Sequence, residues 1–317
     1  MKGEPVPTDR PNDVLRIVVA ALTFRRPDDL AALLPALADQ ADRSTDDVSV
    51  LIVDNDPDGG ARGLVEAFGR GVRYHHAPEP GIAAARNAAL DQAGDADLLV
   101  FIDDDERPVA QWLDLLVATY RRSRPAAVVG PVVSEYAVEL DDWVKAGRFF
   151  DRRRMPTGTE TSVAATNNLL LDLAFVRSIG LRFDLRFGIR GGSDTLFTRA
   201  LHAAGGRLAW CDEAIVTDVV PAKRTTRAWV LQRAYRSGNG DALTSLALTP
   251  AASRRALLRA RLVGRGGIRV LGGGASMLAG RVGRRLDLQA RGRRTFARGA
   301  GMLAGTLGVA YEEYKRS

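Results

Sequence analysis

Residues 98–106 read LLVFIDDDE, an apolar run that ends in four consecutive acids. The run has the length and composition of a buried strand, so the acids fall at its carboxyl end. Side chains alternate across a strand, which predicts Asp103 and Asp105 on one side and Asp104 on the other. A hard cation such as Mg²⁺ or Mn²⁺ would relieve the repulsion between two carboxylates on one side. The pattern also fits a solvated acidic turn before a helix that begins near Val109.

Apolar runs and amphipathic stretches alternate on both sides of this segment. Buried strands are predicted at residues 17–22, 48–53, 72–74, 98–102, 126–133, 169–171, 207–210 and 214–220. Helices are predicted at residues 27–41, 64–68, 82–93, 109–120 and 194–204. The alternation predicts an α/β fold with a largely parallel, doubly wound sheet. Ligands bind such sheets outside the carboxyl ends of the strands.

Polar groups follow three of the predicted strands at that edge. Residues 23–26 (TFRR) follow the first strand, residues 54–56 (DND) follow the second, and the acids follow the strand that ends at Ile102. Three polar ends at one edge predict a ligand site there. Residues 134–165 are less regular, and we expect them to form a loop over the cleft.

Composition and charge bound the remaining possibilities. The chain has 317 residues, of which 46% are hydrophobic and 26% are charged, as in a globular protein. Its one cysteine, Cys211, excludes an internal disulfide and fits a reducing compartment. Residues 1–13 are polar, hold three prolines and lack the apolar core of a signal peptide, so we expect a loose tail.

The net charge of +7 is unevenly distributed. Residues 251–317 hold fifteen Lys and Arg against three acids, a net charge of +12, so residues 1–250 carry −5. A mildly acidic body with a basic extension argues against a nucleic-acid surface over the whole chain, and we expect no nucleic-acid partner.

Five motifs follow one another along residues 14–240. They are Thr23-Phe24-Arg25-Arg26-Pro27, Val53-Asp54-Asn55, Gly81-Ile82-Ala83-Ala84-Ala85-Arg86-Asn87, Asp103-Asp104-Asp105 and Gly192-Ser193-Asp194. In this order the chain resembles the family 2 glycosyltransferases with a GT-A fold. The motifs match the family's nucleotide-binding opening, base-recognition acid, Gly-x-x-x-x-Arg-Asn helix, Asp-x-Asp metal motif and catalytic motif. Two positions depart from the family, with Ser193 where it usually has Glu and Asp218 where many members have a metal-binding His.

The resemblance implies a Rossmann-like, mixed and mostly parallel sheet flanked by helices. It places the GT-A domain at residues 14–240 and leaves residues 241–317 as a basic helical extension. It further implies an inverting transferase that uses a nucleotide-diphosphate sugar, Mg²⁺ or Mn²⁺, and a saccharide or lipid-linked acceptor, as in envelope polysaccharide synthesis.

Residue roles follow from the same resemblance. Asp194 would be the general base, although its position also fits a helix N-cap. The nucleotide would contact Thr23, Phe24, Arg25, Asp54, Arg86, Asp103 and Asp104. The metal would contact Asp105 directly, with Asp103 and Asp218 as further ligands.

Some of these roles have alternatives. Asp103 could instead reach the ribose hydroxyls, and Arg86 could meet phosphate, brace Asp54 or form a surface salt bridge. Donor or acceptor contacts are assigned to Asn167, Asn168, Gly192 and Ser193, although the two asparagines could also satisfy a turn.

Three other function classes compete with a glycosyltransferase. A sugar nucleotidyltransferase would need a Gly-rich, Lys-containing loop after the first strand, and residues 23–27 contain no glycine. An NAD-dependent dehydrogenase fails because Gly-x-Gly-x-x-Gly is missing there. A degenerate transferase that binds nucleotide or polymer without turnover stays open, because Ser193 and Asp218 depart from the family pattern.

The basic extension holds no apolar run of the roughly 20 residues that a bilayer span needs. Its short apolar runs, residues 270–280 and 299–311, are bracketed by arginines. Helices of this kind bind anionic membrane surfaces, or the extension packs on the body or on a second subunit. We expect a cytoplasmic protein, with the inner face of the cell membrane as the surface that the extension would contact.

Overall fold

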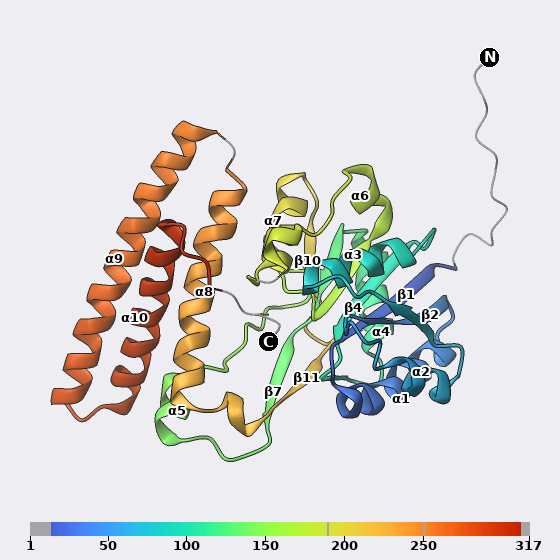
Figure 1. Ribbon diagram of the computed structural model, residues 1–317, viewed down its shortest axis with the longest axis horizontal. Coiled ribbons are helices and arrows are strands. Elements are labelled where there is room, and N and C mark those ends of the chain that lie inside the picture. Colours follow the sequence, from blue (N-terminus) through green and yellow to red (C-terminus); the bar gives the residue numbers. More distant parts are fainter. Residues whose placement is uncertain (1–13, 189, 250, 312–317) are drawn as a thin grey trace.

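The computed structural model describes residues 14–188, 190–249 and 251–311. It consists of an α/β body and a three-helix bundle that stands beside it (Figure 1). The α/β class, the mostly parallel sheet flanked by helices and the helical C-terminal extension are all confirmed. The predicted N-terminal tail, residues 1–13, lies outside the described residues.

An eight-stranded sheet forms the centre of the described body, in the order β3-β2-β1-β4-β9-β6-β10-β8. β1 pairs in parallel with both β2 and β4, whereas β9 runs antiparallel to β4 and β6. The strands are β1 (Arg16–Thr23), β2 (Asp47–Asp54), β3 (Arg73–His76), β4 (Leu98–Asp103), β6 (Ala127–Val129), β8 (Glu160–Thr161), β9 (Asn168–Asp172) and β10 (Leu208–Trp210).

Helices cover both faces of this sheet because successive side chains of β1 point to opposite faces. Ile17, Val19 and Ala21 belong to the core under α1 (Pro27–Arg43) and α4 (Trp112–Ser123). The intervening Val18 and Ala20 belong to a second core, with side chains from α3 (Ile82–Gln92), α6 (Leu173–Ser178) and α7 (Ser193–Ala203). The remaining helices of the body are α2 (Arg62–Phe68), α5 (Asp142–Gly147) and two short 3₁₀ turns at Leu185–Phe187 and Ala222–Arg224.

The strand predicted at residues 126–133 is two strands. β6 ends at Val129, and β7 (Val132–Tyr136) joins β5 (Glu106–Pro108) and β11 (Val216–Val220) in a small second sheet, in the order β5-β11-β7. The chain leaves the main sheet at Gly130-Pro131, where proline cannot donate a ladder hydrogen bond. A side chain at Gly130 would overlap Asn168 and the carbonyl oxygen of Ala214.

The C-terminal bundle consists of α8 (Arg227–Ala247), α9 (Ala252–Val282) and α10 (Leu286–Thr306). α8 begins where the Thr226 side chain accepts a hydrogen bond from the Trp229 amide, and it runs through residue 240 without a break. We therefore propose that the extension begins at α8 rather than at residue 241. No helix among the described residues is both long and apolar enough to cross a bilayer.

An aromatic cluster joins the bundle to the body. Trp143 of α5, with Phe149 and Phe150 after it, packs against Val230 of α8 and Ala290 of α10. These aromatic residues lie within residues 134–165, which were expected to form a loop over the cleft. Burial of apolar side chains instead holds this part of the segment against the bundle.

Glycines let the bundle helices approach one another closely. A Cβ atom at Gly238 of α8 would overlap the carbonyl oxygen of Arg298 in α10, and one at Gly301 of α10 would overlap the carbonyl oxygen of Tyr235 in α8. The glycines of the basic extension therefore serve helix–helix contact in the bundle.

We expect Gly238→Ala to destabilise the bundle by about 1–3 kcal/mol, because two backbones must separate to admit one methyl group. Gly240→Ala in the same helix is the matched control, since a Cβ there meets nothing within 4 Å. Alanine has the higher helix propensity, so the control should be stabilised by up to about 1 kcal/mol. Thermal unfolding followed by helical circular dichroism measures both. Equal midpoints for the two variants would contradict the close approach.

Candidate active site

The carboxyl ends of three strands meet at one edge of the sheet. Thr23 of β1 is in register with Asp54 of β2, and Leu22 of β1 is in register with Asp103 of β4. The parallel pairing of these strands therefore gathers the polar groups that follow them, as the sequence predicted.

The acidic run is held by hydroxyl and guanidinium groups from this edge. Asp104 accepts a 2.8 Å hydrogen bond from the Thr23 hydroxyl and a 2.9 Å bond from Nη1 of Arg26. The same Nη1 lies 2.8 Å from Asp105, which also accepts a 3.3 Å bond from Arg224.

The expectation that Asp104 lies on the opposite side from Asp105 is wrong. β4 ends at Asp103, so residues 104 and 105 lie in a turn where strand alternation no longer applies. A solvated turn is also not what forms, since the side chain of Asp104 is buried.

Arg26 and Arg224 are the site residues that sequence reasoning missed. Arg26 belongs to the motif at residues 23–27, in which the resemblance implies a nucleotide contact for Arg25 instead. Arg25 is largely exposed and contacts Asp56 and Asp58 beside the exposed Phe24 ring. Arg224 carries no local signal, because 119 residues separate it from Asp105.

Burial, reinforced by neighbouring carboxylates, raises the pKa of three acids of the run. Burial, together with the charges of Asp105 and Asp104, raises the pKa of Asp103 to about 7, against the lowering effect of Arg86. Burial likewise raises the pKa of Asp104 to about 6, and it holds the pKa of Glu106 well above its usual value. A cation at this edge would stabilise the ionised forms.

This donor set fits a hard cation only in part. It offers carboxylate oxygens, which Mg²⁺ and Mn²⁺ prefer, but no group of three or more His, Cys, Asp or Glu in the described ranges is arranged to hold a metal. Asp218 lies in β11, where Oδ2 accepts a 3.1 Å bond from Arg152 and Oδ1 has no hydrogen-bond partner among the described residues. The protein would thus supply Asp105 and Asp103, and substrate phosphates would complete the shell.

Asp54 is turned into its own loop, contrary to the base-recognition role expected of it. The residue is fully buried. Its carboxylate accepts bonds of 2.9 Å from the amide of Asp56, 2.9 Å from the amide of Ala61 and 3.0 Å from the Tyr74 hydroxyl. Asp54 therefore shapes the loop after β2, in which Asn55 and Asp56 are also buried.

Arg86 braces Ser193 and does not contact Asp54. Its Nη1 donates a 2.7 Å hydrogen bond to the Ser193 hydroxyl, and its guanidinium lies 5.6 Å from the centre of the Phe183 ring. Ser193 is fully buried at the start of α7, directly after Gly192, whose φ of 85° suits glycine. The Ser193 departure thus places a neutral partner beside a buried arginine.

Asp194, the predicted base, follows on the first turn of α7. Its Oδ1 accepts a 2.6 Å hydrogen bond from the amide of Thr195, and the residue is half-buried. Asp194 lines a cavity of about 360 Å³ between α7 and α8. It is therefore accessible to a ligand while anchored at a helix N-terminus.

The two asparagines have different surroundings. Asn167 donates a 2.7 Å bond to Glu106 and lines a cavity of about 260 Å³. Asn168 is buried, where it accepts a bond from Trp112 and donates to the carbonyls of Pro131 and Ala214. The expected ligand contact of Asn168 is therefore wrong, because its side-chain amide is buried and already hydrogen-bonded within the core.

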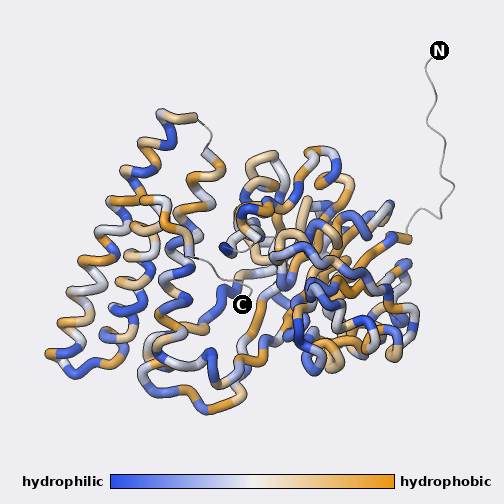
Figure 2. The backbone as a smooth tube through the Cα atoms, in the orientation of Figure 1, coloured by the Kyte–Doolittle hydropathy of each residue, from blue (hydrophilic) through white to orange (hydrophobic). Residues whose placement is uncertain are grey.

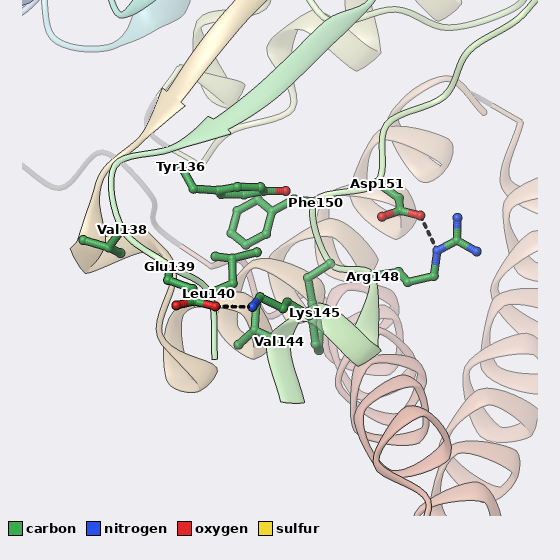
Figure 3. A pocket seen from close by; sticks show the side chains of 10 residues that line it. Tyr136, Val138, Glu139, Leu140, Val144, Lys145, Arg148, Phe150 and Asp151 are labelled. Carbon is green, nitrogen blue, oxygen red and sulfur yellow. Dashed lines mark hydrogen bonds and ion pairs between the residues drawn. The ribbon is translucent and has the colours of Figure 1, made fainter. Parts of the chain in front are cut away.

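The cavities of about 260 and 360 Å³ adjoin, since Val163 and Thr195 line both. A larger cavity of about 500 Å³ lies beside α5 (Figure 3). It contains none of the predicted site residues, and Lys145 and Glu139 form a 2.8 Å ion pair in it. The two adjoining cavities of about 260 and 360 Å³ therefore provide a ligand-sized space next to Asp194.

Comparisons with known proteins agree with this geometry. The family model described as glycosyl transferase family 2 matches residues 18–179. The succinoglycan biosynthesis protein ExoM of Rhizobium meliloti (strain 1021) is 37% identical over 232 residues, which are 72% of this chain and 74% of that protein.

Solved structures show the fold. TarS 1–349 of S. aureus is 14% identical with a TM-score of 0.52, and the match covers 89% of this chain and 91% of that chain. The same TarS segment was solved with UDP and with UDP-GlcNAc. GalNAc-T7 with UDP, GalNAc and Mn²⁺ is 13% identical with a TM-score of 0.51, covering 72% of this chain and 51% of that one. The GT-A fold implied by the resemblance is confirmed.

Proposed function

The chain belongs to glycosyl transferase family 2 and is a glycosyltransferase, and from this premise we propose that it transfers a sugar from a nucleotide-diphosphate donor to a saccharide or lipid-linked acceptor in cell-surface polysaccharide synthesis. The observation that carries the proposal is a link between the acidic run and the space beside Asp194. Glu106 of the run accepts a hydrogen bond from Asn167, which lines the cavity of about 260 Å³, and Asp194 lines the adjoining cavity of about 360 Å³. The printed names of the relatives support it, since ExoM acts in succinoglycan biosynthesis and TarS was solved with UDP-GlcNAc.

The donor end of the proposed site is the edge formed by β1 and β4. Asp105 and Asp103 would hold Mg²⁺ or Mn²⁺, which offsets the charge of the departing diphosphate when it is bound. Arg26 and Arg224 already contact Asp105, so guanidinium groups stand at the same edge to meet phosphate oxygens. Thr23 and Asp104 are buried at this edge and are joined by a hydrogen bond.

The acceptor end is the start of α7. Asp194 would take the proton of the acceptor hydroxyl while the hydroxyl oxygen forms a bond to the anomeric carbon of the donor sugar. The bond between that carbon and the diphosphate would break at the same time, and its electron pair would leave with the diphosphate. One displacement of this kind inverts the anomeric configuration. Ser193 cannot act as the base, and its hydroxyl is held by Arg86.

A thermal-shift screen tests the proposal. Nucleoside diphosphates and sugar nucleotides are added with Mn²⁺ or with EDTA, and one nucleotide should stabilise selectively in Mn²⁺. A ligand at 100 times its Kd adds about 2.7 kcal/mol to the free energy of unfolding. Stabilisation without any sugar transfer or hydrolysis would favour the degenerate transferase, and no response to any nucleotide would contradict the proposal.

We further propose that α9 lies on an anionic membrane surface. Ile268, Leu271, Leu278 and Val282 are 73%, 75%, 64% and 78% exposed, and their spacing places them on one face of the helix. Exposed arginines, including Arg261 and Arg265, precede this face by one to two turns. Figure 2 shows apolar and polar segments alternating along α9. An apolar face beside arginines is typical of helices at membrane interfaces.

Leu271→Glu should weaken binding to anionic vesicles by about ten- to a hundredfold, since burying one leucine contributes about 1.5–3 kcal/mol. Val263→Glu, an exposed position about 80° around α9 from Leu271, lies outside the apolar face and is the matched control. These point changes spare Ala290 of α10, which deletion of residues 251–317 would remove from the aromatic cluster. Co-sedimentation at low and high salt measures the effect, because salt screens the arginines. Equal binding to neutral and anionic vesicles would refute the membrane role.

A further inference from the structure

The cavity of about 360 Å³ beside Asp194 is lined mainly by arginines. Its described lining holds five arginines and two acids, namely Arg190, Arg199, Arg233, Arg236, Arg298, Asp194 and Asp241. One pair is matched, since Arg199 lies 2.7 Å from Asp241. The lining therefore has an excess of three positive charges.

These arginines are crowded against further arginines. Burial, followed by the charges of Arg152, Arg236 and Arg224, lowers the pKa of Arg233 to about 10, against the raising effect of Asp218. Burial and then the charge of Arg298 lower the pKa of both Arg294 and Arg269. The Nε atom of Arg298 is buried without a hydrogen-bond partner in the described chain. Like charges gathered in this way cost free energy unless an anion binds among them.

Two parts of the chain far apart in sequence build this cavity. Arg233 and Arg236 come from α8, Arg298 comes from α10, and Asp194 comes from α7 of the body. Tyr311 returns to α8, where its amide donates a 3.1 Å hydrogen bond to Asn239. Its ring lies 5.7 Å from the Arg236 guanidinium. The bundle thus contributes the positive wall, and the body contributes the predicted base.

We propose that this cavity binds a phosphate or diphosphate group carried by the acceptor, which anchors the acceptor while its hydroxyl reaches Asp194. The proposal rests on the proposed function and adds the chemical class of the acceptor. Guanidinium groups bind phosphate oxygens in bidentate fashion. An excess of three charges suits a multiply charged anion better than a single carboxylate. The donor diphosphate has separate partners, Arg26 and Arg224 at Asp105.

Calorimetry with inorganic pyrophosphate in EDTA tests the cavity without the metal. The variant Arg236→Gln with Arg298→Gln should bind pyrophosphate at least tenfold more weakly than the wild type. The control, Arg259→Gln with Arg291→Gln, removes the same charge from exposed positions of the same bundle and should stay within twofold. Arg236→Lys with Arg298→Lys keeps the charge and should bind with intermediate affinity, which tests the cavity even if the Gln pair does not fold.

Donor binding separates this inference from the proposed function. The Gln pair should still bind the nucleotide that stabilises the wild type in Mn²⁺, whereas failure of the wild type to bind any nucleotide would refute the function alone. Loss of pyrophosphate binding in Arg26→Gln, with no effect of the Gln pair, would place pyrophosphate at the donor edge and overturn the inference.

A second arm distinguishes an anchored phosphate from a free one. Decyl diphosphate below its micelle concentration is compared with pyrophosphate and decanol. Binding of decyl diphosphate at least as tight as that of pyrophosphate, with the same dependence on Arg236 and Arg298, would support a phosphate-bearing acceptor. Binding of pyrophosphate with exclusion of the decyl ester would mean that the cavity accepts only a free anion, which would overturn the acceptor assignment.

Discussion

Replacing Asp194 with Asn is expected to lower sugar transfer by about 100-fold or more while the donor still binds. The amide is nearly isosteric with the carboxylate but cannot accept the acceptor proton. Its oxygen can still take the hydrogen bond that the Thr195 amide donates, so the start of α7 should be preserved. Steady-state transfer rates and nucleotide affinity together measure the effect.

Asp114→Asn makes the same chemical change on the exposed side of α4 and serves as the control. Its transfer rate should match that of the wild type. Near-normal transfer by Asp194→Asn would mean that another residue is the base. Asp218 would then be the next candidate, because its buried Oδ1 has no hydrogen-bond partner in the part of the chain that the structure describes.

Asp105→Ala is expected to abolish Mn²⁺-dependent nucleotide binding in a protein that remains folded. Asp105 is the half-buried end of the acidic run, and two arginines converge on its Oδ2. After its removal Arg26 still has Asp104 as an ion-pair partner, so the edge keeps its internal support. Titration of the nucleotide found in the thermal-shift screen, with Mn²⁺ and with EDTA, gives the affinity difference.

Asp58→Ala removes an exposed acid from the same edge of the sheet and controls for a general change of charge. We expect its metal-dependent binding to be retained. If Asp105→Ala binds the nucleotide with unchanged affinity and unchanged metal dependence, the assignment of the metal to the acidic run is wrong.

Variants at Asp194 and Asp105 test proton transfer and donor binding separately. Loss of Asp194 removes proton transfer from a site that still holds its donor. Loss of Asp105 removes the donor before the base can act. An Asp194 variant that lost donor binding as well as transfer would instead point to a structural role of Asp194 at the start of α7.

Local pattern predicted the fold class and most strands and helices of the body. Alternating apolar runs predicted the strands, and the register of β1 with β2 and β4 brought their polar ends together. The pattern failed at residues 126–133 because a glycine and a proline redirect the chain between two sheets, and a continuous apolar run does not reveal that change.

The partners of individual side chains could not be read from the sequence. Arg86 and Ser193 are 107 residues apart and meet through α3 and α7. Asp54 and Asn168 carry the residue types of ligand-binding groups, yet their polar atoms are used within the fold. Buried polar groups form hydrogen bonds with the groups that packing brings close to them. A local sequence pattern does not show which groups those are.

The sequence by itself determined the fold class, the family resemblance and the edge of the sheet at which chemistry is expected, because side-chain periodicity and short motifs are local properties. Only the tertiary structure decided that Arg26 and Arg224 meet the acidic run, and that the basic extension closes an arginine-lined cavity beside Asp194. These contacts join residues far apart in the chain. Which of these residues meet is decided by how distant elements pack together, and no window of neighbouring residues contains that packing.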